Sequence, residues 1–282
     1  TDWYIDQMVR KAYDSEKVPF SLVQVQYRQG TRDYILMDKR WKGYQNINSV
    51  MDFIKSDKLS TKRKVTSGES INCIPADSLL IPVDKEKVLA NGTVSPEFAD
   101  QIPEQVEWDL PKGHLFKAKM MILDLMANNE WNRPVYFAIT VGDDHYMNLQ
   151  EYFQVEGLAY RVTPIKHKRS ATGETGWIDV DKMYDNLMNK YTWGNMEKPG
   201  VYMGEQVQRM SMNFRNNFAR LAKTLVVDHN DKVRANKVLD RCMELMPPEK
   251  FPYSFVSIYI GDAYLMAGEK EKGEKVLTEI LD

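Results

Sequence analysis

The sequence has only two cysteines and no long apolar run, and these two deficits exclude several classes of protein. Cys73 and Cys242 lie far apart and form no metal-binding or redox motif. We expect two separate buried thiols, with one disulfide between them as the alternative. No apolar run approaches the roughly 20 residues that cross a bilayer, and there is no secretory signal. The chain itself is therefore not expected to span a membrane.

A surplus of positive charge is also missing. The net charge is −2 and the pI is about 6.1, so no overall positive field attracts a phosphate backbone and nucleic acid is not an expected partner. Hydrophobic residues make up 43% of the 282 residues and charged residues 28%. This composition supports a buried core, and the length indicates about two domains.

The ends of the chain indicate a piece of a longer protein. The sequence begins at Thr1 without a methionine and stops at Asp282 within a helical pattern. We therefore expect further residues on both sides, so the missing spans and signals say nothing about the parent protein.

Strand and helix patterns alternate over residues 1–165 and predict a mixed α/β domain with a partly parallel sheet. A first helix is expected to begin at Thr1 or Asp2, and Leu22 to Tyr27 reads as extended. Strands are predicted at 34–37, 71–74, 79–83, 106–110 and 158–164, and helices at 47–54, 85–91 and 115–126, with another beginning after Ser95. Asn46 or Asn48 is expected to cap the first of these three helices, and Asp84 the second.

The stretch Trp131–His145 is the most informative part of this domain. It predicts a buried strand, a turn at Gly142 and a carboxylate-capped helix from about His145 to Glu156. Ligands of open α/β sheets usually bind at such a junction of strand and helix.

The second half of the chain changes in composition. Residues 166–177 predict an exposed loop, whose basic run Lys166–Arg169 is either solvated or in contact with anionic lipid or phosphate. Residues 178–282 predict an all-α domain with two tetratricopeptide-like repeats at about 216–247 and 254–282. Small residues such as Ala235 and Gly261 would let the helices approach closely. We favour a supporting role for these repeats over the binding of a partner.

Catalytic motifs are scarce, and no catalytic residue, metal ligand or cofactor is predicted. The four histidines are scattered, and there is no phosphate loop, dinucleotide fingerprint or nucleophile elbow. Five residues are candidates for ligand binding: Asp143, Asp144, His145, Arg133 and Trp131. The two carboxylates could bind a cation or sugar hydroxyls while His145 shuttles a proton. In the structural alternative, one aspartate caps the helix, the other is solvated, and Trp131 packs in the core rather than on a sugar.

Several local motifs are typical of one protein family. They are Ile81–Leu89, Asp109–Lys112, Trp131–Ala138, Gly157–Val162 and Arg215–Ala222. With them the chain resembles large bacterial membrane proteins, typical of Bacteroidetes, that are similar to the animal transmembrane protein O-mannosyltransferases of the GT-C type. The resemblance covers nearly the whole chain.

The resemblance implies that this chain is the soluble C-terminal region of a multi-spanning glycosyltransferase, on the periplasmic face of the inner membrane. Its partners would be its own membrane domain and an acceptor polypeptide or lipid-linked sugar. The catalytic acid of GT-C enzymes lies in the membrane domain, so a non-catalytic scaffold or acceptor-binding role is implied. The alternatives are a sugar-binding or enzymatic site at Asp143–His145 and a stand-alone repeat module.

Overall fold

The computed structural model describes residues 16–168 and 173–281, which form two compact units. The first, unit 1, consists of the described residues up to Val135 together with Val141–Tyr152 and the described part of 162–175. Unit 2 combines Tyr136–Thr140 and Phe153–Arg161 with everything from Gly176 onward. The predicted boundary at residue 165 had placed the strands of 136–161 with the α/β domain, whereas they belong to the same unit as the helices. The predicted first helix lies outside the described residues.

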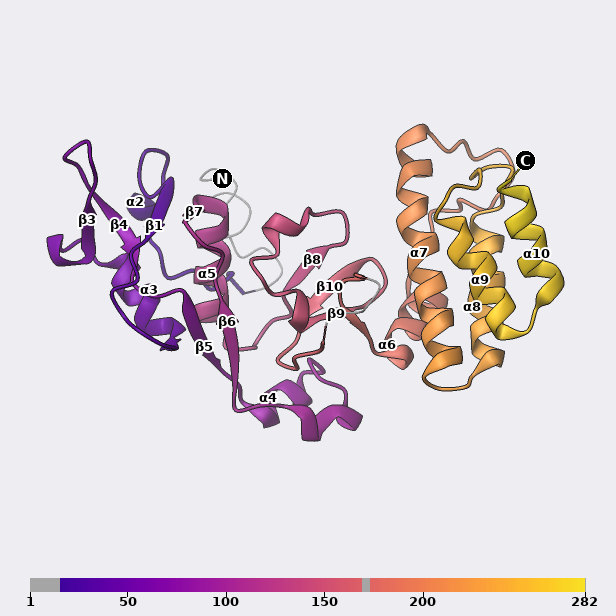
Figure 1. Ribbon diagram of the computed structural model, residues 1–282, viewed down its shortest axis with the longest axis horizontal. Helices are drawn as coiled ribbons and strands as arrows, with labels where there is room; N and C mark the ends of the chain where they lie inside the picture. Colours follow the sequence, from indigo (N-terminus) through magenta and orange to yellow (C-terminus); the bar gives the residue numbers. More distant parts are fainter. Residues whose placement is uncertain (1–15, 169–172, 282) are drawn as a thin grey trace. The chain divides into compact units, whose positions relative to one another are not determined.

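Unit 1 is built on two small mixed sheets (Figure 1). The first has the order β3(Lys62–Lys64), β4(Ser70–Ile74), β1(Tyr34–Met37) and β7(His114–Phe116), and only the β1–β4 pair is parallel. The second orders β2(Gln45–Asn46), β5(Ser78–Pro82) and β6(Gln105–Asp109), with a parallel β2–β5 pair. The expected partly parallel α/β fold is therefore confirmed.

The helices of unit 1 follow local signals in the sequence. α3(Ile47–Lys55) begins where the Asn46 side chain accepts the N–H of Asn48, and it buries one apolar stripe. α4(Lys85–Ala90) begins where Asp84 accepts the N–H of Lys87. α5(Lys117–Asn129) packs with α3 and contacts β1 and β7 of the first sheet, whereas α3 contacts β4 of the first sheet and β2 and β5 of the second. The helix predicted after Ser95 is a 3-10 helix at Pro96–Gln101.

The extended segment predicted at Leu22–Tyr27 is wrong, because α2(Gln24–Tyr27) is a short helix. The apparent alternation misled, since only Leu22 and Tyr27 are buried while Val23 and Val25 point to solvent. The cause is a distant partner, the buried Asp124 of α5, whose carboxylate accepts the N–H groups of Ser21 and Leu22 at 3.0–3.1 Å. This contact fixes the chain just before α2.

The helix predicted from His145 to Glu156 is also wrong. A 3-10 turn at Asp143–His145 and another at Gln150–Tyr152 lead into β9(Phe153–Val155). Met147 and Asn148 adopt left-handed φ values of 52° and 64°, which interrupt any helix. The Met147 carbonyl accepts the indole N–H of buried Trp108 at 2.6 Å, a contact that local periodicity does not reveal.

Unit 2 joins a small sheet to a bundle of helices. The sheet has the order β11(Trp177–Ile178), β9, β10(Ala159–Val162) and β8(Tyr136–Ala138). The buried strand expected over 131–141 is therefore only the short β8, in which Phe137 is buried while Tyr136 and Ala138 are exposed. The helices are α6(Val180–Asp185), α7(Glu205–Val227), α8(Lys232–Leu245), α9(Ser257–Ala267) and α10(Lys270–Glu279), with a π-helical turn at Asn186–Lys190. A helical C-terminal region is thus confirmed, and the tetratricopeptide-like character stays a prediction.

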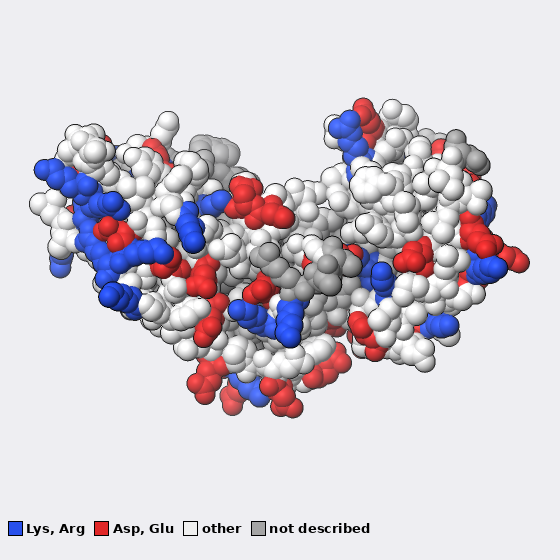
Figure 2. All heavy atoms as spheres, viewed as in Figure 1, with Lys and Arg blue, Asp and Glu red and all other residues white. Residues whose placement is uncertain are grey.

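The two cysteines are free and buried, as expected for separate thiols. Burial raises the pKa of Cys73 to about 11 and that of Cys242 to about 12, so both stay protonated and unreactive at neutral pH. Within the described ranges 16–168 and 173–281, no helix is long and apolar enough to cross a membrane. Figure 2 shows that Lys and Arg side chains gather over the β3 and β4 region of unit 1.

Candidate functional site

The turn that follows α5 holds two of the predicted site residues, Trp131 and Arg133, and part of its backbone is strained. Glu130 and Trp131 both have left-handed φ values, 45° and 59°. For residues other than glycine, each such conformation costs about 1–2 kcal/mol. Strain of this kind persists only where the surroundings fix it, and it gathers at binding sites. The turn is therefore one place in unit 1 to look for a site.

Neighbouring side chains fix this turn from both sides. Lys87 of α4 donates to the Glu130 carbonyl at 3.2 Å, and the Asn91 amide donates to the Trp131 carbonyl at 2.7 Å. The Trp131 indole donates in turn to the Pro82 carbonyl at 2.8 Å. These three bonds tie the end of α5 to α4 and to the end of β5.

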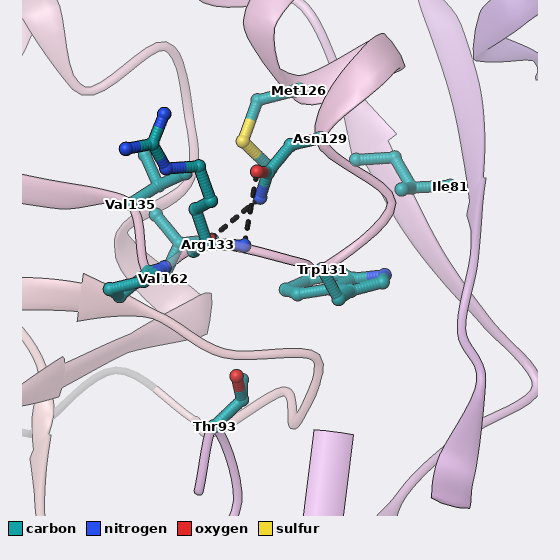
Figure 3. A pocket seen from close by; sticks show the side chains of 9 residues that line it. Ile81, Thr93, Met126, Asn129, Trp131, Arg133, Val135 and Val162 are labelled. Carbon is teal, nitrogen blue, oxygen red and sulfur yellow. Dashed lines mark hydrogen bonds between the residues drawn. The ribbon is translucent and has the colours of Figure 1, made fainter. Parts of the chain in front are cut away.

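Arg133 is held by the same turn. The Asn129 side chain accepts the Arg133 N–H at 3.2 Å and donates to the Arg133 carbonyl at 2.8 Å (Figure 3). The Arg133 guanidinium points away from the Trp131 ring and donates to the Glu16 carbonyl at 2.8 Å. In this contact the Arg133 guanidinium thus binds a backbone carbonyl.

One pocket lies on the Arg133 side of Trp131 and is very small. Its lining consists of Ile81, Thr93, Met126, Asn129, Trp131, Arg133, Pro134, Val135 and Val162 (Figure 3). The space open to the centre of a water molecule is about 10 Å³, enough for about one water. A sugar ring or peptide side chain does not fit there, so this pocket is part of the packed core.

A larger groove borders Trp131 and the residues Asp84 and Lys87 at α4, and we call it the Trp131 groove. Its volume is about 320 Å³, at the lower end of the range typical of ligand sites. It is lined by Ile47, Asn48, Ile81, Pro82, Val83, Asp84, Lys87, Met126, Ala127, Glu130 and Trp131. Trp131 is only 6% exposed, so its ring forms a wall of the groove and not a free platform for stacking.

The polar rim of the groove comes from three helices. Asn48 is exposed in the first turn of α3, and Asp84 stands at the N-terminus of α4. The Lys87 ammonium lies 4.0 Å from the Glu130 carboxylate. Hydrogen-bond donors and acceptors therefore surround an apolar floor, an arrangement that can bind a chain with both apolar and hydroxyl groups. Of these rim residues, the sequence had marked only Asp84 and Asn48, and only as helix caps.

The turn at Asp143–His145 holds a separate pair of interacting side chains. All three residues are exposed. The His145 Nδ1 lies 2.8 Å from Asp144 Oδ1, and the Lys119 ammonium lies 3.6 Å from the same carboxylate. The hydrogen bond with His145, followed by the nearby charges, lowers the pKa of Asp144. Asp144 can thus orient the imidazole, whereas the residue at the N-cap position of this turn is Gly142, without a side-chain cap.

The structure brings Trp131 and Arg133 together in one turn and Asp144 and His145 together in one hydrogen bond. Asp143, Asp144 and His145 are not among the residues that line either pocket beside Trp131. The role of these three as a ligand site therefore stays a prediction.

Comparison with known families accounts for the motifs around this turn. Residues 1–182 match the family model of TMEM260-associated domain 2. The chain belongs to this family. The match fits the predicted resemblance, because the TMEM260-like family is related to O-mannosyltransferases. No curated protein and no solved structure matches the chain. The Trp131 groove and the Asp143–His145 turn both lie within the matched residues.

Proposed function

We propose that this chain is a non-catalytic accessory region of a TMEM260-like membrane protein, and that its Trp131 groove binds an extended acceptor polypeptide. The family match supports the accessory role, since the matched model describes a TMEM260-associated domain. In this proposal the chain lies on the periplasmic face beside its own membrane domain. That membrane domain transfers the sugar by GT-C chemistry, and unit 1 holds the acceptor.

The shape and lining of the Trp131 groove carry the acceptor-binding role. Its floor of Ile47, Ile81 and Met126 offers apolar contact. The rim offers the amide of Asn48 and the ammonium of Lys87. An extended peptide presents alternate side chains to a surface. A segment with apolar residues on one side and serine or threonine hydroxyls at the edge therefore matches this groove.

The test is the affinity of the chain for a labelled, unstructured peptide rich in serine and threonine, measured by fluorescence anisotropy. Asn48→Trp places a bulky ring on the groove rim, and we expect it to weaken binding by about tenfold, the equivalent of about 1.4 kcal/mol. Ser49→Trp is the matched control, because Ser49 is also exposed on α3 but does not line the groove. Equal affinities for both variants and the unaltered chain would refute the groove as the binding site.

A second candidate function rests on the hydrogen bond between Asp144 and His145. An exposed imidazole oriented by a carboxylate can bind a polar ligand or shuttle a proton. His145→Gln keeps a polar side chain but removes the titrating group, so this candidate predicts a large loss of the parent protein's transfer activity. Full activity of that variant would exclude a catalytic role for the pair.

A further inference from the structure

The edge strand of the first sheet carries the most concentrated positive charge of unit 1. Residues 58–64 read Lys-Leu-Ser-Thr-Lys-Arg-Lys and hold four basic residues with no acidic one. Because the whole chain has a net charge of −2, the remainder carries −6. We call residues 58–64 the basic edge, and Figure 2 shows the surrounding cluster of Lys and Arg over β3.

Acidic neighbours offset the charge of the basic edge only in part. The residues paired with Lys62, Arg63 and Lys64 across the β3–β4 ladder are Asn72, Ile71 and Ser70. Arg63 lies 3.4 Å from the Asp38 carboxylate. Lys58, Lys62 and Lys64 form no ion pair with any of the residues that the structure describes. Three ammonium groups are thus available to an external anion.

An apolar side chain projects from the same edge. Leu59 is 79% exposed in the turn Leu59–Thr61 that leads into β3, directly after Lys58. The Arg40 guanidinium holds this turn by donating to the carbonyls of Ser60 and Lys62. Leu59 is therefore displayed by a fixed turn, with lysines on both sides of it.

We propose that the basic edge binds the surface of an anionic phospholipid bilayer, with its lysines at the phosphate groups and Leu59 in the apolar boundary. Lysines alone would suit any polyanion, whereas an exposed leucine between them suits a surface that is anionic outside and apolar beneath. The negative remainder of the chain is repelled by such a surface, so the charge asymmetry orients unit 1 with β3 toward the lipid. This contact goes beyond the proposed binding of an acceptor, which uses the Trp131 groove.

The test is flotation of the whole chain with two kinds of vesicle. One contains phosphatidylcholine alone, and in the other phosphatidylglycerol makes up about a third of the lipid. We expect binding only to the anionic vesicles, weakening as salt is raised. Each lysine at an anionic surface contributes about fivefold to the partition coefficient, so Lys62→Gln with Lys64→Gln should lower it by about thirtyfold. Leu59→Ser should weaken binding while the salt dependence is kept.

Two matched controls separate this proposal from its alternatives. Lys270→Gln with Lys275→Gln removes the same charge from exposed positions of α10 and should leave vesicle binding unchanged. Lys166→Gln with Lys168→Gln tests the loop that was the earlier candidate for lipid contact. Loss of binding in either control but not in the variant of the basic edge would overturn the proposal. So would lysine-dependent binding to soluble heparin together with no binding to anionic vesicles.

Discussion

The two compact units use their buried polar groups in different ways. In unit 1, the buried Asp124 and Asn129 bind backbone groups of turns, and a groove stays open beside Trp131. In unit 2, polar and small residues bring helices together. The buried Arg215 of α7 donates to the carbonyls of Met246 and Phe251 at 2.8 and 2.6 Å.

This difference indicates a division of labour. Both the Trp131 groove and the basic edge lie in unit 1 and within the matched residues 1–182. Helices α7 to α10 begin after that match, and the buried Arg215 of α7 makes its hydrogen bonds inside the bundle. We therefore propose that unit 1 binds the partner and that the helices of unit 2 have a supporting role. The predictions below test each half of the comparison.

The largest effect is expected for Arg215→Met. Arg215 is 1% exposed, and its guanidinium donates hydrogen bonds to carbonyls of the 246–252 segment. Its loss therefore leaves buried acceptors without donors. Each buried acceptor left unpaired costs about 1–3 kcal/mol, so we expect a total cost of about 3–5 kcal/mol in the free energy of unfolding of the helices. Urea denaturation followed by circular dichroism measures it. Arg209→Met, at an exposed ion pair with Glu205, should cost less than about 1 kcal/mol. Similar costs for both variants would show that Arg215 does not hold the bundle.

A smaller effect, confined to unit 1, is expected for Asp124→Ala. The buried carboxylate accepts two backbone N–H groups of Ser21 and Leu22 and the Asn128 amide at 2.9 Å. Leaving these donors unpaired should cost about 2–4 kcal/mol. Hydrogen exchange of the α2 amides should accelerate, while exchange in α7 to α10 stays unchanged. Uniform acceleration over both units would contradict their independence.

Gly261→Ala tests the close packing of α9 and α10. A Cβ at Gly261 would lie 2.7 Å from the Leu277 Cγ, which is closer than real contacts allow. Overpacking of this kind should cost about 1–3 kcal/mol. Adding Leu277→Ala should recover part of that loss, as a double-mutant cycle of thermal or urea midpoints would show. Additive losses would mean that the two helices do not meet at this pair.

The smallest effect concerns the pH dependence of unit 1. Burial lowers the pKa of His167 from 6.5 to about 4, so the native state binds fewer protons than the unfolded state between these values. The resulting stability is complete above pH 6.5 and is lost as the pH falls toward 4. His167→Gln should reduce the loss of unfolding free energy between pH 6.5 and pH 4. The reduction should be smaller than the pKa shift alone would give, because the ring is only half-buried. His229→Gln, at an exposed position, is the control, and an equal flattening there would contradict the role of burial.

Local signals in the sequence predicted local structure well. Asn46 and Asp84 cap the helices that follow them, as expected, because a cap acts within one turn. The failures at Leu22–Tyr27 and His145–Glu156 share one cause, a distant partner. Asp124 fixes the first segment and Trp108 bonds within the second, and neither contact has a signature in a short window.

The candidate site was predictable only in part, for the same reason. Trp131 and Arg133 were chosen from one continuous stretch and do lie in one turn. The Trp131 groove also needs Asn48, Lys87 and Glu130, which lie up to 82 residues apart in sequence and meet through the packing of α3, α4 and α5. A single sequence does not show which separate helix ends converge.

The most direct test of the division of labour is hydrogen–deuterium exchange of the chain with and without the serine- and threonine-rich peptide. The account predicts protection at the residues that line the Trp131 groove, around 47–48, 81–87 and 126–131, and no change in α7 to α10. Protection confined to α7 to α10, or no protection at the groove under conditions where the peptide binds, would contradict it.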